Sequence, residues 1–448
     1  MSLNLGQFFR ACNPRYTLNM ANPEDRQYYI DFAPVRGSNV IRELKRTIAF
    51  SLAEPTCQLF TGHIGCGKST ELSRLKTELE AEKFHVVYFE SSQDLDMADV
   101  DISDILLAIA RQVSQSLEAS GISLQPKRFQ SLLQGAANLL NADITALRGN
   151  IPFVGDVGVR TDSESFSLAF GIGEITAKAK DSKDVRALLR QHLEPRVNNI
   201  IEAINQEVIA PAQQQLKEKG QSGLVVIVDN LDRIDNKPKF GDRTQPEYIF
   251  VERGEQLNKL RCHVVYTIPL ILTFSNDKEA ISNRFGSHAK LLPMVRVKER
   301  EGGDCEAGIY RLRQMVLARA FPELEEKERL ARIPELFDSP ETLNRLCKMS
   351  GGHVRNLLIL LFNCLQKDDP PFSGSLIDRV LSERRNELGK AITADEWQLL
   401  QQVATAKSVR GEEEYQTLLR SLFVFEYCDE NGSWFDLNPV LEGTKELQ

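Results

Sequence analysis

A glycine-rich turn between an apolar segment and a helical segment constrains this chain most strongly. The turn begins at Gly62 and ends in Lys68-Ser69, after the apolar run Cys57–Thr61 and before an amphipathic segment, Ser69–Lys83. Glycines allow a tight path that aims several backbone N–H groups inward, and the helix N-terminus adds partial positive charge. Such a turn binds a chain of phosphates, so we expect nucleotide contacts from Gly62, His63, Ile64, Gly65, Cys66, Gly67, Lys68, Ser69 and Thr70.

Two side chains of the turn carry specific chemistry. Lys68 is predicted to reach the β- and γ-phosphates as a point charge, and the Ser69 hydroxyl to coordinate Mg²⁺. The metal needs a second partner, which is commonly an Asp at the end of a neighbouring buried strand. The run Leu224–Asp229 supplies it, and we expect Asp229 to hold Mg²⁺ through its water shell.

Apolar runs alternate with helical segments along the first 270 residues. Alternating strands and helices build a parallel sheet, and central strands that are buried on both faces read as continuous apolar runs. The fold class is therefore predicted as α/β. The expected elements are strands at 57–61, 85–90, 223–229 and 263–269 and helices at 69–83 and 102–117.

The residues after Asp229 bear on hydrolysis. Many hydrolysing ATPases place a Glu directly after this Asp, and here that position is Asn230. Asp232 is our candidate for orienting the attacking water, and the alternative is that it caps the following helix. Without the Glu, hydrolysis is expected to be slow.

The turn at 62–70 and the sequence VVIVDNLDR together resemble P-loop ATPases of the AAA+ and STAND (signal-transduction ATPases with numerous domains) assemblage, including the KAP-type branch. The D-x-L-D spacing is more similar to STAND and KAP proteins than to AAA+ unfoldases. The resemblance covers roughly residues 30 to 370 and implies that the ligand is ATP. KAP proteins often carry inserted membrane helices, but the longest apolar stretch here, 263–274, is too short for one. A soluble member is therefore expected.

Three further roles follow from the resemblance. Thr267, at the end of a strand, occupies the position of a polar sensor-1 residue, although the Arg common in NACHT-type members is missing. Arg284 lies in a sequence that resembles the box presenting an arginine finger to a neighbouring subunit; the alternative is a surface salt bridge. Arg355 lies in a turn similar to the sensor-2 turn of origin-recognition and loader-type ATPases, and the alternative is a solvent-facing helical residue.

The changes in periodicity predict four parts. They are a turn-rich lead-in that packs on the core (1–45), a P-loop ATPase core (46–295) with an insertion (120–220), a helical lid (296–370) and a small winged-helix-like unit (371–448). In the insertion, alternation at Phe166, Leu168, Phe170 and Ile172 predicts a half-buried strand. A long amphipathic helix from Asp184 to about Leu216, kinked at Pro195 and Pro211, covers the core or offers a partner surface.

The C-terminal unit is predicted from two short helices, 395–405 and 412–419, and a hairpin, 422–437. It carries eight Lys and Arg against 14 Asp and Glu, the reverse of a phosphate-contacting surface. We therefore interpret it as a protein-contact or autoinhibitory module. DNA binding is kept as the rival, through Arg296, Lys298, Arg300, Arg311 and Arg313.

The function expected from these features is a slow ATPase switch. ATP would close the lid and permit self-assembly through Arg284. It would also reorient the C-terminal unit toward a protein partner or separate effector. The alternatives are a DNA-binding AAA+ ATPase of the initiator or transposition-regulator kind, and a nucleotide-binding scaffold without turnover. The net charge of −8 gives no global attraction to nucleic acid or anionic lipid, and the absence of a secretory signal or membrane span predicts a cytoplasmic protein.

Overall fold

A five-stranded parallel sheet organises the computed structural model, which describes residues 3–52, 54–124, 126–136, 171–173, 175–177, 182–411 and 413–447. The strand order is β2-β3-β6-β1-β7, and it confirms the predicted α/β class. The short edge strand β7 was not anticipated; it pairs with Phe60 and Thr61. The bounds are β1 (Cys57–Thr61), β2 (Phe84–Glu90), β3 (Gly223–Asp229), β6 (His263–Thr267) and β7 (Lys290–Leu291).

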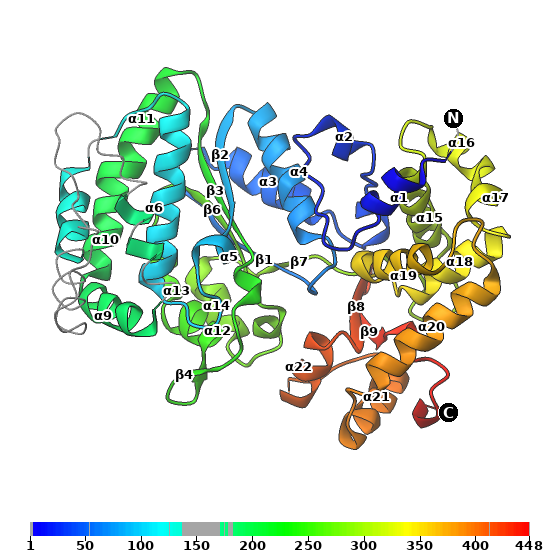
Figure 1. Ribbon diagram of the computed structural model, residues 1–448. Coiled ribbons are helices and arrows are strands. Elements are labelled where there is room, and N and C mark those ends of the chain that lie inside the picture. Colours follow the sequence, from blue (N-terminus) through cyan, green and yellow to red (C-terminus); the bar gives the residue numbers. More distant parts are fainter. Residues whose placement is uncertain are drawn as a thin grey trace, which may run out of the picture.

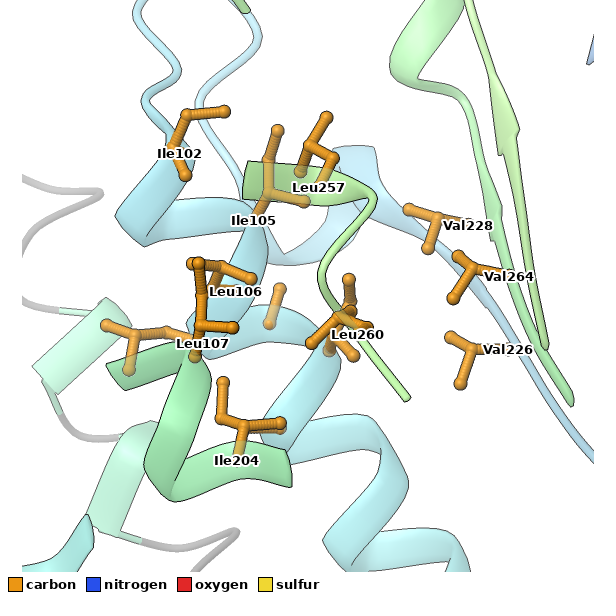
Figure 2. Close-up of a cluster of buried hydrophobic side chains, with 14 of the residues drawn as sticks. Ile102, Ile105, Leu106, Leu107, Ile204, Val226, Val228, Leu257, Leu260 and Val264 are labelled. Atoms are coloured by element: carbon orange, nitrogen blue, oxygen red, sulfur yellow. The ribbon is translucent and has the colours of Figure 1, made fainter. Parts of the chain in front are cut away.

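Helices cover both faces of the sheet (Figure 1). Side chains alternate between the two faces of a strand, so Val226 and Val228 join the core beneath α6 (Ile102–Ala119), whereas Val225 and Ile227 join the core beneath α3 (Val40–Phe50) and α4 (Lys68–Ala81). Figure 2 shows the first of these cores, with Val226, Val228 and Val264 of the sheet directed toward α6. The continuous apolar runs seen in the sequence are explained by this burial on both sides.

The long helical stretch predicted in the insertion covers the core. It consists of α9 (Lys183–Leu193), η2 (Glu194–Arg196), α10 (Val197–Ala203), the π-helical η3 (Ile204–Ile209) and α11 (Ala210–Glu218). The irregular segments fall at the predicted kinks, because Pro195 lies in η2 and Pro211 follows η3 closely. Apolar side chains such as Ile200 and Ile204 pack with α6. Of the half-buried strand, Phe166, Leu168 and Phe170 lie outside the described residues, and Ile172 is helical and buried.

Short elements connect the central strands. None of them was predicted, and they bring polar turns to the edge of the sheet. They are α5 (Ser91–Asp94), η4 (Leu231–Arg233), β4 (Pro238–Phe240), β5 (Arg243–Thr244), α12 (Gln245–Glu247), η5 (Tyr248–Glu252), α13 (Gly254–Leu257), η6 (Leu270–Thr273) and α14 (Lys278–Phe285).

The lead-in packs on the lid as well as on the core, where the Met20 amide donates to the Ser73 hydroxyl of α4 at 2.9 Å and the Tyr29 hydroxyl to the Glu71 carboxylate at 3.2 Å. Phe8 and Ile30 share a hydrophobic cluster with Leu312 and other lid residues, and the Arg319 guanidinium donates to the Ala11 carbonyl at 3.1 Å. Only α3 packs on the sheet. The lead-in elements are α1 (Leu5–Ala11), α2 (Pro23–Arg26) and η1 (Ala33–Val35); the lid helices are α15 (Glu306–Ala320), α16 (Glu326–Ala331), α17 (Ile333–Leu336), α18 (Pro340–Met349) and α19 (Val354–Lys367).

The C-terminal unit contains the predicted helices and hairpin in the predicted order. A further helix precedes them, and the hairpin is packed against the core side of the molecule, with Tyr427 and Trp434 stacked 4.6 Å apart between ring centroids. The elements are α20 (Gly374–Gly389), α21 (Ala394–Ala406), α22 (Glu413–Arg420), β8 (Val424–Asp429), β9 (Gly432–Leu437), η7 (Pro439–Leu441) and η8 (Lys445–Leu447). Figure 1 places β8 and β9 between the core and the lid.

Candidate nucleotide-binding site

The carboxyl ends of the central strands meet at one edge of the sheet. Glu90 is in register with Asp229, and Phe60 with Thr267, so β1, β2, β3 and β6 end together. The glycine-rich turn leaves this edge after β1 and enters α4. A cavity at this edge is lined by the turn, by Asp229 and by residues of the lead-in and the lid.

The glycines of the turn are required by its backbone. Gly65 and Gly67 have left-handed conformations, with φ of +89° and +107°. Gly67 is the N-cap residue of α4 and offers no side-chain oxygen, so the first amide groups of the helix stay available for phosphate oxygens. At Gly65, a Cβ atom would lie 2.8 Å from the ring of His353, so any side chain here would push the lid away.

Lys68 is buried and held in place by oxygen atoms. Its Nζ donates to the carbonyls of Gly62 at 2.8 Å and His63 at 2.9 Å, and lies 3.0 Å from Oδ2 of Asp232. Burial by itself would lower the pKa of Lys68, but the Asp232 carboxylate leads the opposing effects and the pKa is raised. The ammonium group is therefore charged at the cavity, as the binding of a phosphate requires.

Asp229 and Ser69, the two expected Mg²⁺ ligands, lie together at the cavity. The Asp229 carboxylate accepts hydrogen bonds from the Ser69 hydroxyl, from the Tyr88 hydroxyl at 2.8 Å and from the Asn230 amide at 2.7 Å. Burial, and then the charge of Asp232, raise the pKa of Asp229. A divalent cation would compensate this buried charge, so the hydroxyl and carboxylate oxygens fit Mg²⁺. Tyr88, on β2, carried no sequence signal.

Asp232 does not cap a helix. It lies within the single turn η4, where Oδ2 contacts Lys68 and the buried Oδ1 has no hydrogen-bond partner in the described part of the chain. That oxygen is a free acceptor at the cavity wall. Asn230 has a left-handed φ of +67°, and its side-chain amide donates to the Ser92 hydroxyl at 3.2 Å.

Two predicted site residues lie away from the cavity. The Thr267 hydroxyl accepts from the Leu231 amide at 3.0 Å and lies 3.4 Å from the Val228 carbonyl, so it supports the turn after Asp229 from behind. Arg284, on α14, donates to the Glu252 carbonyl at 3.1 Å, a backbone partner in place of the salt bridge considered as its alternative. Within one copy of the chain, neither side chain lines the cavity.

The start of the lid helix α19 lies against the glycine-rich turn. The Arg355 amide donates to the Gly65 carbonyl at 3.2 Å, and the His353 ring contacts the Ile64 carbonyl at 2.8 Å. The Arg355 side chain lines the cavity, so it does not face open solvent as the alternative interpretation required. Burial, followed by the nearby charge of Arg233, lowers the pKa of Arg355.

The rest of the cavity wall was missed by the sequence analysis. The lead-in contributes Tyr16, Leu18 and Tyr28, and the lid contributes Met315 and Leu358. These apolar and aromatic side chains suit the flat face of a base next to the phosphate-binding residues. Only the aromatic content of the turn-rich lead-in could have suggested this wall.

A buried cation from the lead-in also reaches the turn. The Arg36 guanidinium donates to the Cys66 carbonyl at 2.8 Å and to the Pro293 carbonyl at 2.7 Å. It fixes the turn against the strand exit at residue 293. No motif pointed to this residue.

Comparison with known families confirms the resemblance that the two motifs carry. Residues 38–239, less than half of the chain, match the profile of the KAP family P-loop domain. Across the described residues, no helix is both long and apolar enough to cross a membrane. No curated protein matches the chain significantly.

Solved structures show a remote likeness over nearly the whole chain. The Aeropyrum pernix ORC2 protein, solved as ADPNP–ADP complexes, has 13% identity and a TM-score of 0.42, with 98% of this chain and 95% of that chain covered. The Walker-type ATPase paby2304 of Pyrococcus abyssi has 12% identity and a TM-score of 0.40, covering 96% and 98%. The Aeropyrum pernix ORC1 protein in complex with DNA has 11% identity and a TM-score of 0.38, covering 96% and 94%. At these values the likeness says nothing about what this chain binds.

Proposed function

We propose that this protein binds ATP with Mg²⁺ at the cavity, hydrolyses it slowly, and acts as a switch in which the nucleotide sets the position of the C-terminal unit. The P-loop match supports the nucleotide site. The observation that supports the switch is the contact between the glycine-rich turn and the C-terminal hairpin. This contact joins the nucleotide site to a unit that is far away in the sequence.

The residues of the site divide the chemistry between them. The amide groups of the turn and Lys68 bind the β- and γ-phosphates, and Ser69 and Asp229 hold Mg²⁺, which would neutralise phosphate charge. Water attacks the γ-phosphorus while the bond to the β,γ-bridging oxygen breaks, giving ADP and phosphate. Asp232 Oδ1 is the free acceptor that orients this water. Asn230 is a neutral amide and cannot take up the proton, so turnover is slow.

One aromatic side chain joins three parts of the molecule beside the turn. The Phe425 ring, on β8, stacks on His353 of the lid at 5.6 Å between centroids and meets His63 of the turn edge-on at 6.0 Å. The Glu426 amide donates to a ring nitrogen of His63 at 3.1 Å. The turn, the lid and the C-terminal hairpin are therefore packed on one another.

His63 links this junction to the phosphate-binding lysine. Its carbonyl accepts from Lys68 at 2.9 Å, while its ring accepts from the hairpin. Burial is the main cause that lowers the pKa of His63 to about 3, so the ring is neutral and can accept a hydrogen bond. A nucleotide that moves Lys68 or the turn also moves His63, and so changes how the hairpin packs against the turn. Linkage then requires that the hairpin contact change nucleotide affinity by the same factor.

The experiment that tests the switch is hydrogen exchange on the purified chain with ADP-Mg²⁺ and with a non-hydrolysable ATP analogue. We expect β8 and β9 to exchange differently in the two states, and this difference to disappear in Phe425→Ala. The matched control is Phe240→Ala, because Phe240 is 59% exposed and outside the junction. Equal exchange of β8 and β9 in both states of the parent protein would disprove the switch.

No observation favours the DNA-binding alternative. Three of the five basic residues considered for it are paired with carboxylates within the chain: Arg296 with Glu299, Lys298 with Asp436, and Arg300 with Asp429. Paired cations release fewer counterions on contact with phosphates. A phosphate-contacting stripe on this surface is thus partly neutralised.

A further inference from the structure

Two arginine side chains meet at the cavity from different parts of the chain. Arg233 comes from η4, directly after Asp232, and Arg355 comes from the start of the lid helix α19. Both line the same cavity as Lys68 and Asp229. The meeting of the two guanidinium groups is a feature of the fold that the motifs did not indicate.

The guanidinium groups of Arg233 and Arg355 differ from the other cations at the cavity in their contacts. Lys68 is paired with Asp232, and Arg36 donates to two carbonyls. Among the described residues, neither Arg233 nor Arg355 forms a salt bridge, although each lies close enough for the charge of one to act on the other. The Asp232 carboxylate also acts on Arg355, but it is paired with Lys68, so two guanidinium groups face the cavity with no carboxylate of their own among the described residues. The arrangement fits an anionic group brought by the ligand.

The turn that carries Arg233 is fixed relative to the phosphate-binding residues. The Leu231 amide donates to the Thr267 hydroxyl at 3.0 Å, and the neighbouring Asp232 lies 3.0 Å from the Lys68 ammonium. Arg233 is exposed at the rim of the cavity, beyond this ion pair. Arg233 directly follows the partner of Lys68 in the sequence, so its long side chain starts close to the place where Lys68 would bind a phosphate chain.

We propose that Arg233 binds the terminal phosphate of the nucleotide from within the same chain, opposite Arg355. This inference rests on the proposed ATP site. A guanidinium group presents paired donors to phosphate oxygens, so the two arginines would hold the γ-phosphate and stabilise the charge that moves to the β,γ-bridging oxygen as that bond breaks. ADP lacks this phosphate, so Arg233 distinguishes ATP from ADP. This role needs no neighbouring subunit, in contrast to that predicted for Arg284.

The test compares fluorescent ADP with a fluorescent non-hydrolysable ATP analogue in Mg²⁺. For Arg233→Ala we expect a loss of affinity of about 10- to 100-fold for the triphosphate and less than about threefold for the diphosphate. Arg233→Lys should restore part of the triphosphate affinity, because it keeps the charge but loses the paired donors. The matched control is Lys237→Ala, a cation near η4 whose side chain is 63% exposed and pairs with Asp235.

The outcomes separate this inference from the proposed function. Equal losses for both nucleotides, or no loss for the triphosphate, would overturn the role of Arg233 while leaving the ATP site intact. A parent protein that binds neither nucleotide would remove both proposals. Circular dichroism of each variant checks that an altered affinity does not come from unfolding, and Arg233→Gln repeats the test with a side chain of similar length.

Discussion

At the scale of residues, ionisable groups are buried on both sides of the glycine-rich turn. Lys68 and Asp232 form an ion pair on the cavity side. On the other side, Glu426 of the hairpin is 5% exposed, and its Oε2 atom has no hydrogen-bond partner among the described residues. Burial raises the pKa of Glu426 to about 7, with Ser433 and Lys278 opposing the shift. Glu426 and Asp232 lead to separate predictions.

Replacing Glu426 by Gln should stabilise the protein at alkaline pH. Glutamate in the unfolded chain has a pKa near 4.5, so between pH 4.5 and about 7 the folded protein holds more protons than the unfolded chain. Folding stability therefore falls as pH rises through this window, and stays lowered above it. The variant lacks this penalty, and we expect it to exceed the parent by about 1–3 kcal/mol at pH 8 and by much less at pH 4.5.

Urea denaturation at the two pH values measures this difference. Glu430→Gln is the matched control, since Glu430 lies exposed in the turn of the same hairpin. A Glu426→Gln variant that tracks the parent at both pH values would show that the carboxyl group ionises without cost.

Asp232→Asn should slow hydrolysis and spare binding. The amide keeps the shape of the side chain but is a weaker acceptor for the attacking water, so we expect turnover to fall by about 100-fold with ATP affinity within about threefold. Lys68→Ala should instead abolish binding. Phosphate release and fluorescent-nucleotide binding measure the two effects, with Asp235→Asn as the control. Turnover at the parental rate in Asp232→Asn would disprove its water-orienting role.

At the scale of elements, the turn between α18 and α19 lets the lid and the C-terminal hairpin approach. Gly351 and Gly352 are both left-handed, with φ of +64° and +71°. A Cβ atom on Gly351 would lie 2.5 Å from the Phe425 ring, and one on Gly352 would lie 1.7 Å from the Val295 carbonyl oxygen. The Gly351 carbonyl also accepts from the Tyr427 hydroxyl at 2.8 Å. The two glycines thus permit the contact that the proposed switch uses.

Gly351→Ala should destabilise the protein by about 2–4 kcal/mol, because the left-handed backbone and the overlap with Phe425 both cost free energy. Gly389→Ala is the control: a Cβ atom there would meet no atom within 4 Å, and its backbone has no positive φ. Urea denaturation measures both variants. An equal loss of unfolding free energy in the two variants would mean that packing of Gly351 against the hairpin contributes little to stability.

At the scale of the whole molecule, the lead-in and the lid line the nucleotide cavity, and the C-terminal unit contacts the turn that forms it. Arg284 lies on α14, outside this arrangement. Its predicted role therefore requires a second copy of the chain, supplied by assembly in the ATP state.

Light scattering after size exclusion tests assembly. We expect the mass to increase with the ATP analogue and Mg²⁺ and not with ADP, and Arg284→Ala to bind nucleotide as a monomer but to lose turnover in the assembled form. Arg379→Ala, which changes an exposed residue of α20, is the control. Equal loss in a dilute monomer would remove the role in trans, and growth that requires added duplex DNA would favour the rival function.

The parts of the molecule whose residues are contiguous could be predicted from the amino-acid sequence. The strand, turn and helix around Lys68 and the apolar run ending in Asp229 are local patterns, so their structure follows from spacing and burial. The alternation of such units then specifies a parallel sheet, which the strand order bears out.

Which distant residues meet at the turn became visible in the three-dimensional fold. Tyr16, Met315 and Phe425 lie far apart in the sequence and share no periodicity, and their meeting depends on how separate hydrophobic clusters pack together. Likewise, the Thr267 side chain contacts the backbone after β3, and Arg233 lines the cavity because it lies in the turn η4. Packing of separate clusters is a long-range property, and no spacing along the chain encodes it.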